Sequence, residues 1–120
     1  MWPLDPLPQP PVPQRLREML KDYPDLIQRL QEGLNRVVTK PAKPHPPFEV
    51  AIWTLEDMLS GFISEAREDL EIAEASGDPV AIEKADSKVD LMLSARSSGG
   101  GMRNLSELRD YFQVKKGSFR

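Results

Sequence analysis

Apolar residues between positions 48 and 73 recur with the spacing of an α-helix. The series starts at Phe48, steps forward by three or four residues at a time, and reaches Ala73. Its other members are Ile52, Leu55, Leu59, Phe62, Ala66 and Leu70, and Ile63 widens the stripe. Such a stripe lets one side of a helix bury itself against a neighbour. Since a helix rises about 1.5 Å per residue, we expect residues 48–76 to form a rod roughly 43 Å long.

The tetrapeptide SGDP ends this helix and begins another. Gly77 suits the left-handed conformation found just past many helix ends. Asp78 is a favourable N-cap, and Pro79 is a favourable first helical residue. We expect a second helix over residues 79–96, and a connection this short makes the two helices antiparallel neighbours. The predicted apolar face of the second helix consists of Ile82, Ala85, Val89, Met92 and Leu93.

Proline divides the amino-terminal part of the chain into segments. Six of the twelve prolines lie in residues 1–13, which predicts an extended arm because proline fixes φ and lacks an amide donor. Residues 14–38 are expected to form two short amphipathic helices that Pro24 separates, and residues 39–47 a proline-rich linker. Within the arm, PPVPQR fits the PxxPxR pattern that SH3 domains bind. We favour a structural role, in which Pro13 begins the next helix.

The carboxyl-terminal part is expected to contain a glycine-rich hinge at 97–104, followed by a short helix and a basic tail at 105–120. Asn104 and Glu107 have the spacing of a capping box, in which each side chain bonds to the backbone amide of the other residue. No segment alternates apolar and polar residues as a half-buried strand does. The sequence therefore predicts an all-α fold, with a long antiparallel helical hairpin at 48–96 packed with two or three shorter helices. A second protomer could complete this bundle-like arrangement by self-association, as a homodimer.

Length and composition limit the classes of protein that fit. A chain of 120 residues with 39% hydrophobic residues fits one small domain. Cysteine is absent, which excludes disulfides, thiolate metal sites and thiol catalysis. The amino terminus lacks the basic and apolar regions of a signal peptide, and no apolar run reaches the ~20 residues that cross a bilayer. We therefore expect a soluble, cytoplasmic protein that does not bind a membrane.

The formal net charge of −3 hides an uneven distribution. Residues 48–96 contain four Lys/Arg and twelve Asp/Glu, whereas the segments on either side carry a small positive excess. An acidic block repels phosphate backbones and attracts basic surfaces. The sequence therefore indicates another protein with a basic surface as the partner, and argues against nucleic acid. The alternative is a solvated helix face whose charge only provides solubility.

Three glycines, Gly99, Gly100 and Gly101, lie between Arg96 and Arg103. Successive glycine amides ahead of a helix can bind phosphate, and the two arginines would add positive charge. The familiar glycine-rich phosphate loops follow a β-strand and have a fixed spacing, which this segment lacks. We favour a hinge, because three adjacent glycines maximise backbone freedom. A weak anion-binding site is the alternative.

Five carboxylates crowd one stretch of the long helix. They are Glu65, Glu68, Asp69, Glu71 and Glu74. Such a cluster can bind a metal ion, but di-metal helical bundles add histidines at fixed offsets from the glutamates. The single histidine, His45, lies in the linker without a second ligand at metal-binding spacing, and no serine lies in a G-x-S-x-G motif. The sequence therefore predicts no catalytic residue, no metal site and no cofactor.

Five residues are candidates for contact with a partner. They are Trp2, Phe48, Trp53, Glu65 and Asp69. Aromatic side chains bury a large area at interfaces, and the two carboxylates belong to the acidic block. For Trp53 we favour packing inside the protomer over an exposed contact. Trp2 has no core of its own on the proline-rich arm, which makes it a candidate for docking onto a groove of the same or another molecule.

These features predict a non-enzymatic helical module for protein–protein interaction. An adaptor, a chaperone-like protein or a small inhibitor that binds a partner through its helical faces would fit. One alternative is a nucleic-acid-associated regulator that uses the basic residues near the ends, namely Arg96, Arg103, Lys115 and Lys116. The least favoured alternative is an enzyme that binds a phosphate or nucleotide at the glycine loop.

Overall fold

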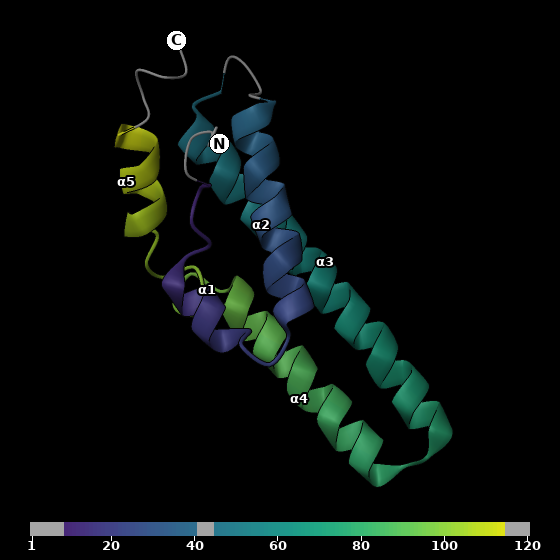
Figure 1. Ribbon diagram of the computed structural model, residues 1–120. Helices are drawn as coiled ribbons and strands as arrows, with labels where there is room; N and C mark the ends of the chain where they lie inside the picture. Colours follow the sequence, from purple (N-terminus) through teal and green to yellow (C-terminus); the bar gives the residue numbers. More distant parts are fainter. Residues whose placement is uncertain (1–8, 41–44, 115–120) are drawn as a thin grey trace, which may run out of the picture.

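The computed structural model describes residues 9–40 and 45–114, and this part of the chain forms five α-helices and no strand (Figure 1). The helices are α1 (Gln14–Met19), α2 (Pro24–Thr39), α3 (Pro47–Ser76), α4 (Pro79–Arg96) and α5 (Ser106–Val114). The predicted all-α fold with a long antiparallel hairpin is confirmed. None of the described helices is both long and apolar enough to pass through a bilayer. Trp2, Lys115 and Lys116 lie outside the described residues.

The connection between α3 and α4 has the predicted turn chemistry. Gly77 has a φ of 73°, which favours glycine because it lacks a Cβ, and its amide donates to the carbonyls of Ala73 and Glu74. The Asp78 side chain accepts a hydrogen bond from the Val80 amide at 3.1 Å, so it caps α4 as expected. The two helices then pack side by side as an antiparallel hairpin (Figure 1).

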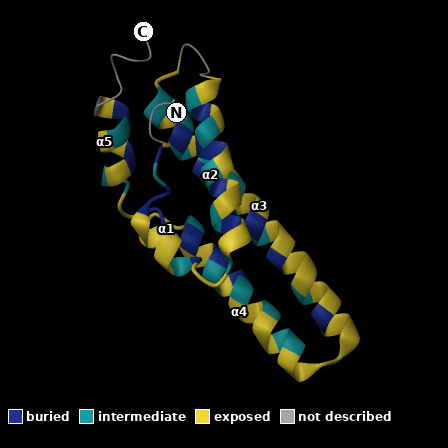
Figure 2. Ribbon diagram, in the orientation of Figure 1, coloured by how far each residue is buried: buried dark blue, intermediate teal, exposed yellow. Residues whose placement is uncertain are grey.

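The core lies where the shorter helices cover the half of the hairpin remote from its tip (Figure 2). α2 packs on α3 and α1 packs on α4, while α5 adds Leu108 and Phe112 to the same core. The largest fully buried side chains include Leu16, Leu20, Leu30, Leu34, Leu55, Leu59, Met92 and Leu108. The short amino-terminal helices therefore cover the hairpin, as expected from their apolar stripes.

The buried face of α4 differs from the predicted one. Met92 is buried as expected, but Leu93 is 41% exposed and Ala95 is buried instead. Ala95 lies beneath the glycine-rich segment, since a Cβ added to Gly101 would meet both Ala95 and Leu16 of α1. The prediction of Leu93 as a core residue is wrong because α1 and this segment pack on a neighbouring face of α4, which periodicity within α4 does not reveal.

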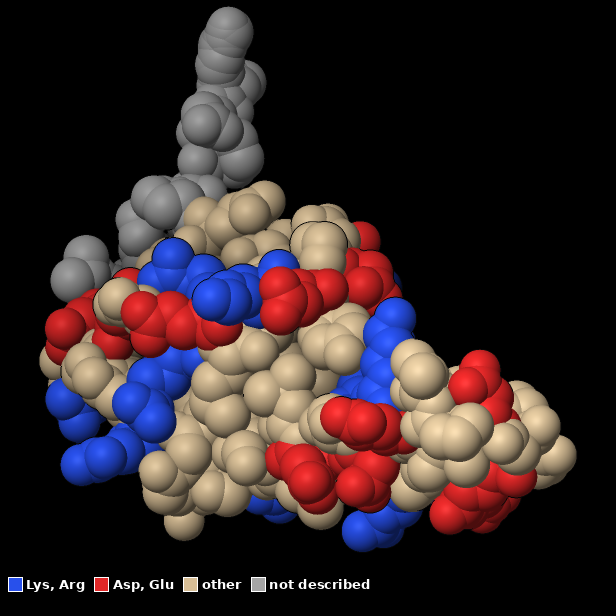
Figure 3. Space-filling model, turned by 90° about the horizontal axis from the view of Figure 1, so that it is seen from below, with Lys and Arg blue, Asp and Glu red and all other residues tan. Residues whose placement is uncertain are grey.

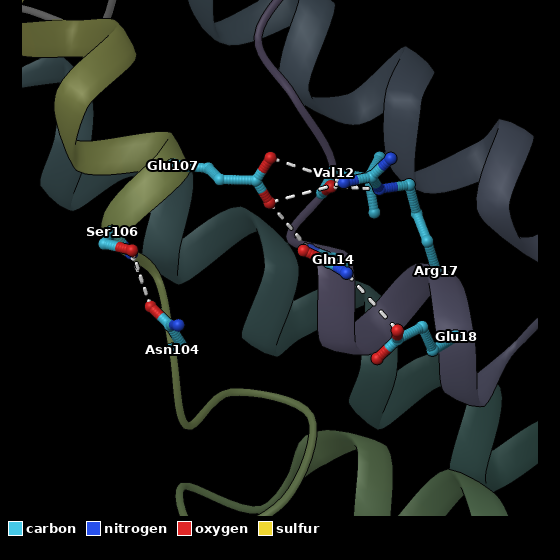
Figure 4. A network of polar contacts seen from close by, with 7 residues as sticks. All are labelled: Val12, Gln14, Arg17, Glu18, Asn104, Ser106 and Glu107. Atoms are coloured by element: carbon cyan, nitrogen blue, oxygen red, sulfur yellow. Dashed lines mark hydrogen bonds and ion pairs between the residues drawn. The ribbon is translucent and has the colours of Figure 1, made fainter.

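The start of α5 differs from the predicted capping box (Figure 4). Asn104 Oδ1 accepts hydrogen bonds from the Ser106 amide at 3.0 Å and the Ser106 hydroxyl at 2.7 Å, so Asn104 caps α5. Glu107 turns instead to α1, where its carboxylate accepts from the Gln14 amide at 3.0 Å and from Arg17 Nη2 at 3.3 Å. The reciprocal half of the predicted box is therefore wrong. The reason is that α1 has no side-chain cap of its own, and its first amide needs an acceptor.

The tip of the hairpin extends beyond the shorter helices, and we call residues 69–88 the hairpin arm (Figure 1). The molecule measures 55 × 33 × 22 Å and its radius of gyration is 16.7 Å, whereas a compact domain of this length has about 14 Å. Most residues of the arm are exposed (Figure 2). The arm is therefore the part of the hairpin that α1, α2 and α5 leave largely uncovered.

Candidate protein-interaction surface

The glycine-rich segment forms a turn in which the amides from Gly100 onward are bonded to the protein itself. The amides of Gly100 and Met102 donate to the Ser97 carbonyl at 3.1 Å, and the Gly101 amide donates to the Ser94 carbonyl at 3.0 Å. A phosphate cradle needs such amides to point toward the ligand. Here they point to carbonyls at the end of α4, so the geometry gives no support to the weak anion-binding site.

Two of the three glycines, Gly100 and Gly101, are needed because there is no room for a Cβ, and not because of their backbone conformation. A Cβ on Gly100 would meet the Ser94 carbonyl, and one on Gly101 would meet the Ala95 carbonyl and a leucine of α1. A Cβ on Gly99 would meet nothing closer than 4.0 Å. The segment expected to be a hinge is therefore, at Gly100 and Gly101, a tightly packed turn against α4 and α1.

The arginines beside this turn do not converge on it. Arg96 Nε donates to Ser60 Oγ at 3.2 Å, and its Nη1 lies 3.9 Å from Glu56, so this side chain links α4 to α3. Arg103 is exposed. The guanidinium that contacts the turn is that of Arg15, which donates to a carbonyl of the turn at 2.9 Å. These contacts do not assemble a cationic site for a phosphate.

The PxxPxR motif is part of the fold. Pro10, Val12 and Pro13 are buried, and Gln31 of α2 donates to the Pro10 carbonyl at 2.7 Å. The arginine of the motif, Arg15, is bonded to the glycine-rich turn. An SH3 domain needs the prolines of its ligand to be accessible, so the burial supports the structural role of this motif.

The two aromatic candidates on α3 do not form one patch. Phe48 is partly buried and its ring centroid lies 6.5 Å from that of Phe112, so it belongs to the edge of the core. Trp53 is 48% exposed, and its ring meets His45 edge-on with centroids 5.2 Å apart. Trp53 is therefore not a core residue, contrary to the favoured interpretation. Leu55 is on the buried face of α3, and a residue two positions away lies on the opposite side of the helix.

Glu65 forms an ion pair with another residue of the same chain. Its carboxylate accepts hydrogen bonds from the Arg29 guanidinium of α2 at 2.8 and 3.0 Å, and Arg29 also lies over the Phe62 ring at 4.6 Å. These hydrogen bonds, aided by the charges of Arg29 and Lys88, hold the pKa of Glu65 below its ordinary value against the opposing effect of partial burial. Glu65 therefore fastens α2 to α3 and is not a free contact residue.

The Glu65→Gln variant is expected to lose about 0.5 kcal/mol of unfolding free energy at neutral pH, the size typical of an exposed ion pair. Because folding lowers the pKa of Glu65, this stabilisation is present above the unfolded-state pKa and is lost as the pH falls through the folded-state pKa. Urea unfolding of both proteins at several pH values measures it, and the two stabilities should converge in acid. Glu68→Gln is the control, because Glu68 is exposed and has no ion pair among the described residues. An equal loss in both variants would contradict the assignment.

A groove runs along the arm between α3 and α4. It has a volume of about 460 Å³ and is lined by Tyr23, Asp69, Ile72, Ala73, Ser76, Ala81, Lys84, Ala85 and Lys88. At the end of the groove nearest the core, Lys88 Nζ lies 3.9 Å from the Asp69 carboxylate and 4.8 Å from the centre of the Tyr23 ring. Ile72 stands at the rim with 69% of its surface exposed. The arm therefore offers a shallow, partly apolar surface that includes the predicted contact residue Asp69.

Most carboxylates of the arm lie outside this groove. Glu71, Glu74 and Asp86 are exposed and do not line it, and we call these three the arm carboxylates. Figure 3 shows acidic residues beside uncharged ones on the protruding part of the molecule, at the right. Within residues 9–40 and 45–114, no three His, Cys, Asp or Glu side chains are grouped so as to hold a metal ion. The negative charge of the arm is therefore exposed to any basic surface that approaches it.

Sequence reasoning did not single out Ile72 and Lys84, which shape this surface. Ile72 falls outside the buried stripe of α3, and an apolar residue outside such a stripe was the available signal. Lys84 is one of two lysines in an acidic arm. Its position on the groove follows from the packing of α3 on α4, which the sequence of one helix does not specify.

Comparison with known proteins adds no assignment to this surface. No protein-family model, no curated protein and no solved structure matches the chain. Its function therefore has to follow from the geometry and charge of the molecule.

Proposed function

We propose that this protein is a non-enzymatic interaction module, of the adaptor, chaperone-like or small-inhibitor class, that binds another protein through the hairpin arm. The supporting observation is that the arm extends beyond the core and carries apolar side chains in water. Ile72 is 69% and Val80 is 75% exposed. Burial of an aliphatic side chain of this size contributes about 1.5–3 kcal/mol, so a partner that covers the arm gains affinity without any rearrangement of the core.

Charge favours a basic protein as the partner. Glu71, Glu74 and Asp86 are exposed on the arm, and the hairpin as a whole has a large excess of acidic residues. Complementary charge raises the association rate and selects among partners, and it weakens with salt. The arm carboxylates therefore act chiefly in the encounter with a basic surface, while the apolar side chains add to the lifetime of the complex.

Nucleic-acid binding and nucleotide chemistry have less support. Arg96 is directed to Ser60 and Glu56 of α3, and Lys115 and Lys116 lie outside the described residues. The acidic arm repels a phosphate backbone. At the glycine loop, the amides of Gly100, Gly101 and Met102 are bonded to carbonyls and do not face a ligand.

A photo-crosslinking amino acid at Ala75 tests the proposal, because this residue is exposed on the arm, next to Glu74 and one helical turn after Glu71. In cells that express the protein, we expect a covalent adduct with a second, basic protein. The same amino acid at Gln28, which is exposed on α2, is the matched control and should give no such adduct. Neutralising the arm carboxylates should reduce the adduct several-fold. Equal labelling from the two positions, or no adduct from Ala75, would refute the arm as the binding surface.

A further inference from the structure

The two rims of the groove differ in shape. The α4 rim consists of Ala81, Lys84, Ala85 and Lys88, which have the spacing i, i+3, i+4 and i+7. Four residues in this arrangement surround the hole into which one side chain of a facing helix inserts in knobs-into-holes packing. The alanines leave this hole open. The α3 rim carries Ile72, which is 69% exposed and has the size and shape of such a knob.

The two rims also differ in charge. The α3 rim carries Asp69 and the α4 rim carries Lys84 and Lys88. Asp69 and Lys88 lie 3.9 Å apart, so they stand at the same level along the arm. A two-fold axis parallel to the arm preserves this level and places the α3 rim of each copy on the α4 rim of the other. Asp69 of each copy then faces Lys88 of the other copy, and the four charges alternate in sign.

We propose that the occupant of this groove is the same groove of a second copy of the chain, related by a two-fold axis parallel to the arm. Each Ile72 inserts among Ala81, Lys84, Ala85 and Lys88 of the other copy, so the contact is isologous and the paired arms form a four-helix bundle. A two-fold axis perpendicular to the arm would instead place the α3 rim of one copy on the α3 rim of the other. Repulsion between the two Asp69 side chains disfavours that arrangement. This inference goes beyond the proposed function, because it assigns the groove and Ile72 to the second copy and leaves Val80 and the arm carboxylates to the basic partner.

Sedimentation velocity of the purified full chain over a range of concentrations tests the dimer. Because the arm is short, the contact is at the low end of specific interfaces, below about 1,200 Å². We expect a dimer that dissociates on dilution to the 13.6 kDa monomer. Ile72→Glu should raise the dissociation constant at least about tenfold, as loss of a central anchor does. Val80→Glu introduces the same charge at a residue that is 75% exposed and does not line the groove, and it should leave the constant unchanged.

Engineered cysteines test the orientation, since the chain has no cysteine of its own. When Ile72→Cys chains are mixed with Ala85→Cys chains and oxidised, the mixed disulfide should exceed either symmetric one. Circular dichroism establishes that each variant is folded.

Three results would overturn the proposal: a chain that stays monomeric up to its solubility limit, equal effects of Ile72→Glu and Val80→Glu, or a predominance of symmetric disulfides. If a helix of another protein fills the groove, the purified chain stays monomeric. That outcome overturns the proposal that a second copy occupies the groove, while an adduct formed from Ala75 would still support the proposed function.

Discussion

Gly101→Ala is expected to lower the free energy of unfolding by about 3 kcal/mol, at the upper end of the usual cost of overpacking. The added Cβ would meet the Ala95 carbonyl and the side chain of Leu16. The carbonyl belongs to the backbone of α4 and Leu16 is fully buried, so neither can yield without moving a helix. Urea unfolding followed by circular dichroism measures the loss as a lower midpoint with an unchanged slope.

Gly99→Ala is the matched control for this prediction. Its Cβ would meet nothing closer than 4.0 Å, and its backbone does not adopt a positive φ. We therefore expect a change of no more than about 0.5 kcal/mol, in either direction. Similar losses at the two positions would show that the segment needs glycine for its flexibility, as a hinge does, and not for close packing at Gly101.

Met92→Ala is expected to cost about 2–5 kcal/mol, the range observed when a buried Leu, Ile or Met is cut back to alanine. Met92 is fully buried in the core cluster between the hairpin and the covering helices. Its removal loses the transfer energy of the side chain and leaves a cavity that rigid neighbours cannot fill. Equilibrium unfolding of the purified chain gives the magnitude.

The adjacent Leu93→Ala substitution tests whether α4 is oriented as the structure shows or as the apolar periodicity of its sequence predicts. Leu93 belongs to the apolar face that the sequence predicts, but it is 41% exposed. We expect a loss below about 1 kcal/mol, because part of its surface is already in water. If Leu93→Ala cost as much as Met92→Ala, the orientation of α4 described above would be wrong.

Local chemistry explains why much of the hairpin could be predicted. Gly77, Asp78 and Pro79 act within one turn of the chain, and the hydrogen bond from the Val80 amide to Asp78 joins residues two positions apart. The long stripe of α3 is regular enough to identify its buried face. Such features depend on near neighbours in sequence, so the ends of α3 and α4 agree with expectation.

The candidate surface was much less predictable. Trp53 was expected to pack inside the protomer, yet it is 48% exposed beside His45. Glu65 was a candidate contact residue, yet it is bonded to Arg29, 36 positions away. Asp69 does line the groove, but Ile72, which forms its rim, was not singled out. Which exposed residues share a surface depends on how α3 and α4 pack together, and on where α2 stops covering them.

The sequence by itself determined five helical segments, the turn at Gly77 and the absence of cysteine, because helix propensity, capping and residue type act over a few positions. Only the tertiary structure decided that Glu107 supplies the acceptor for the Gln14 amide across 93 positions. It alone also decided that Gly101 lies against Ala95 and that the hairpin arm is left uncovered. These outcomes depend on the relative placement of helices that are far apart in the chain, and no local pattern encodes that placement.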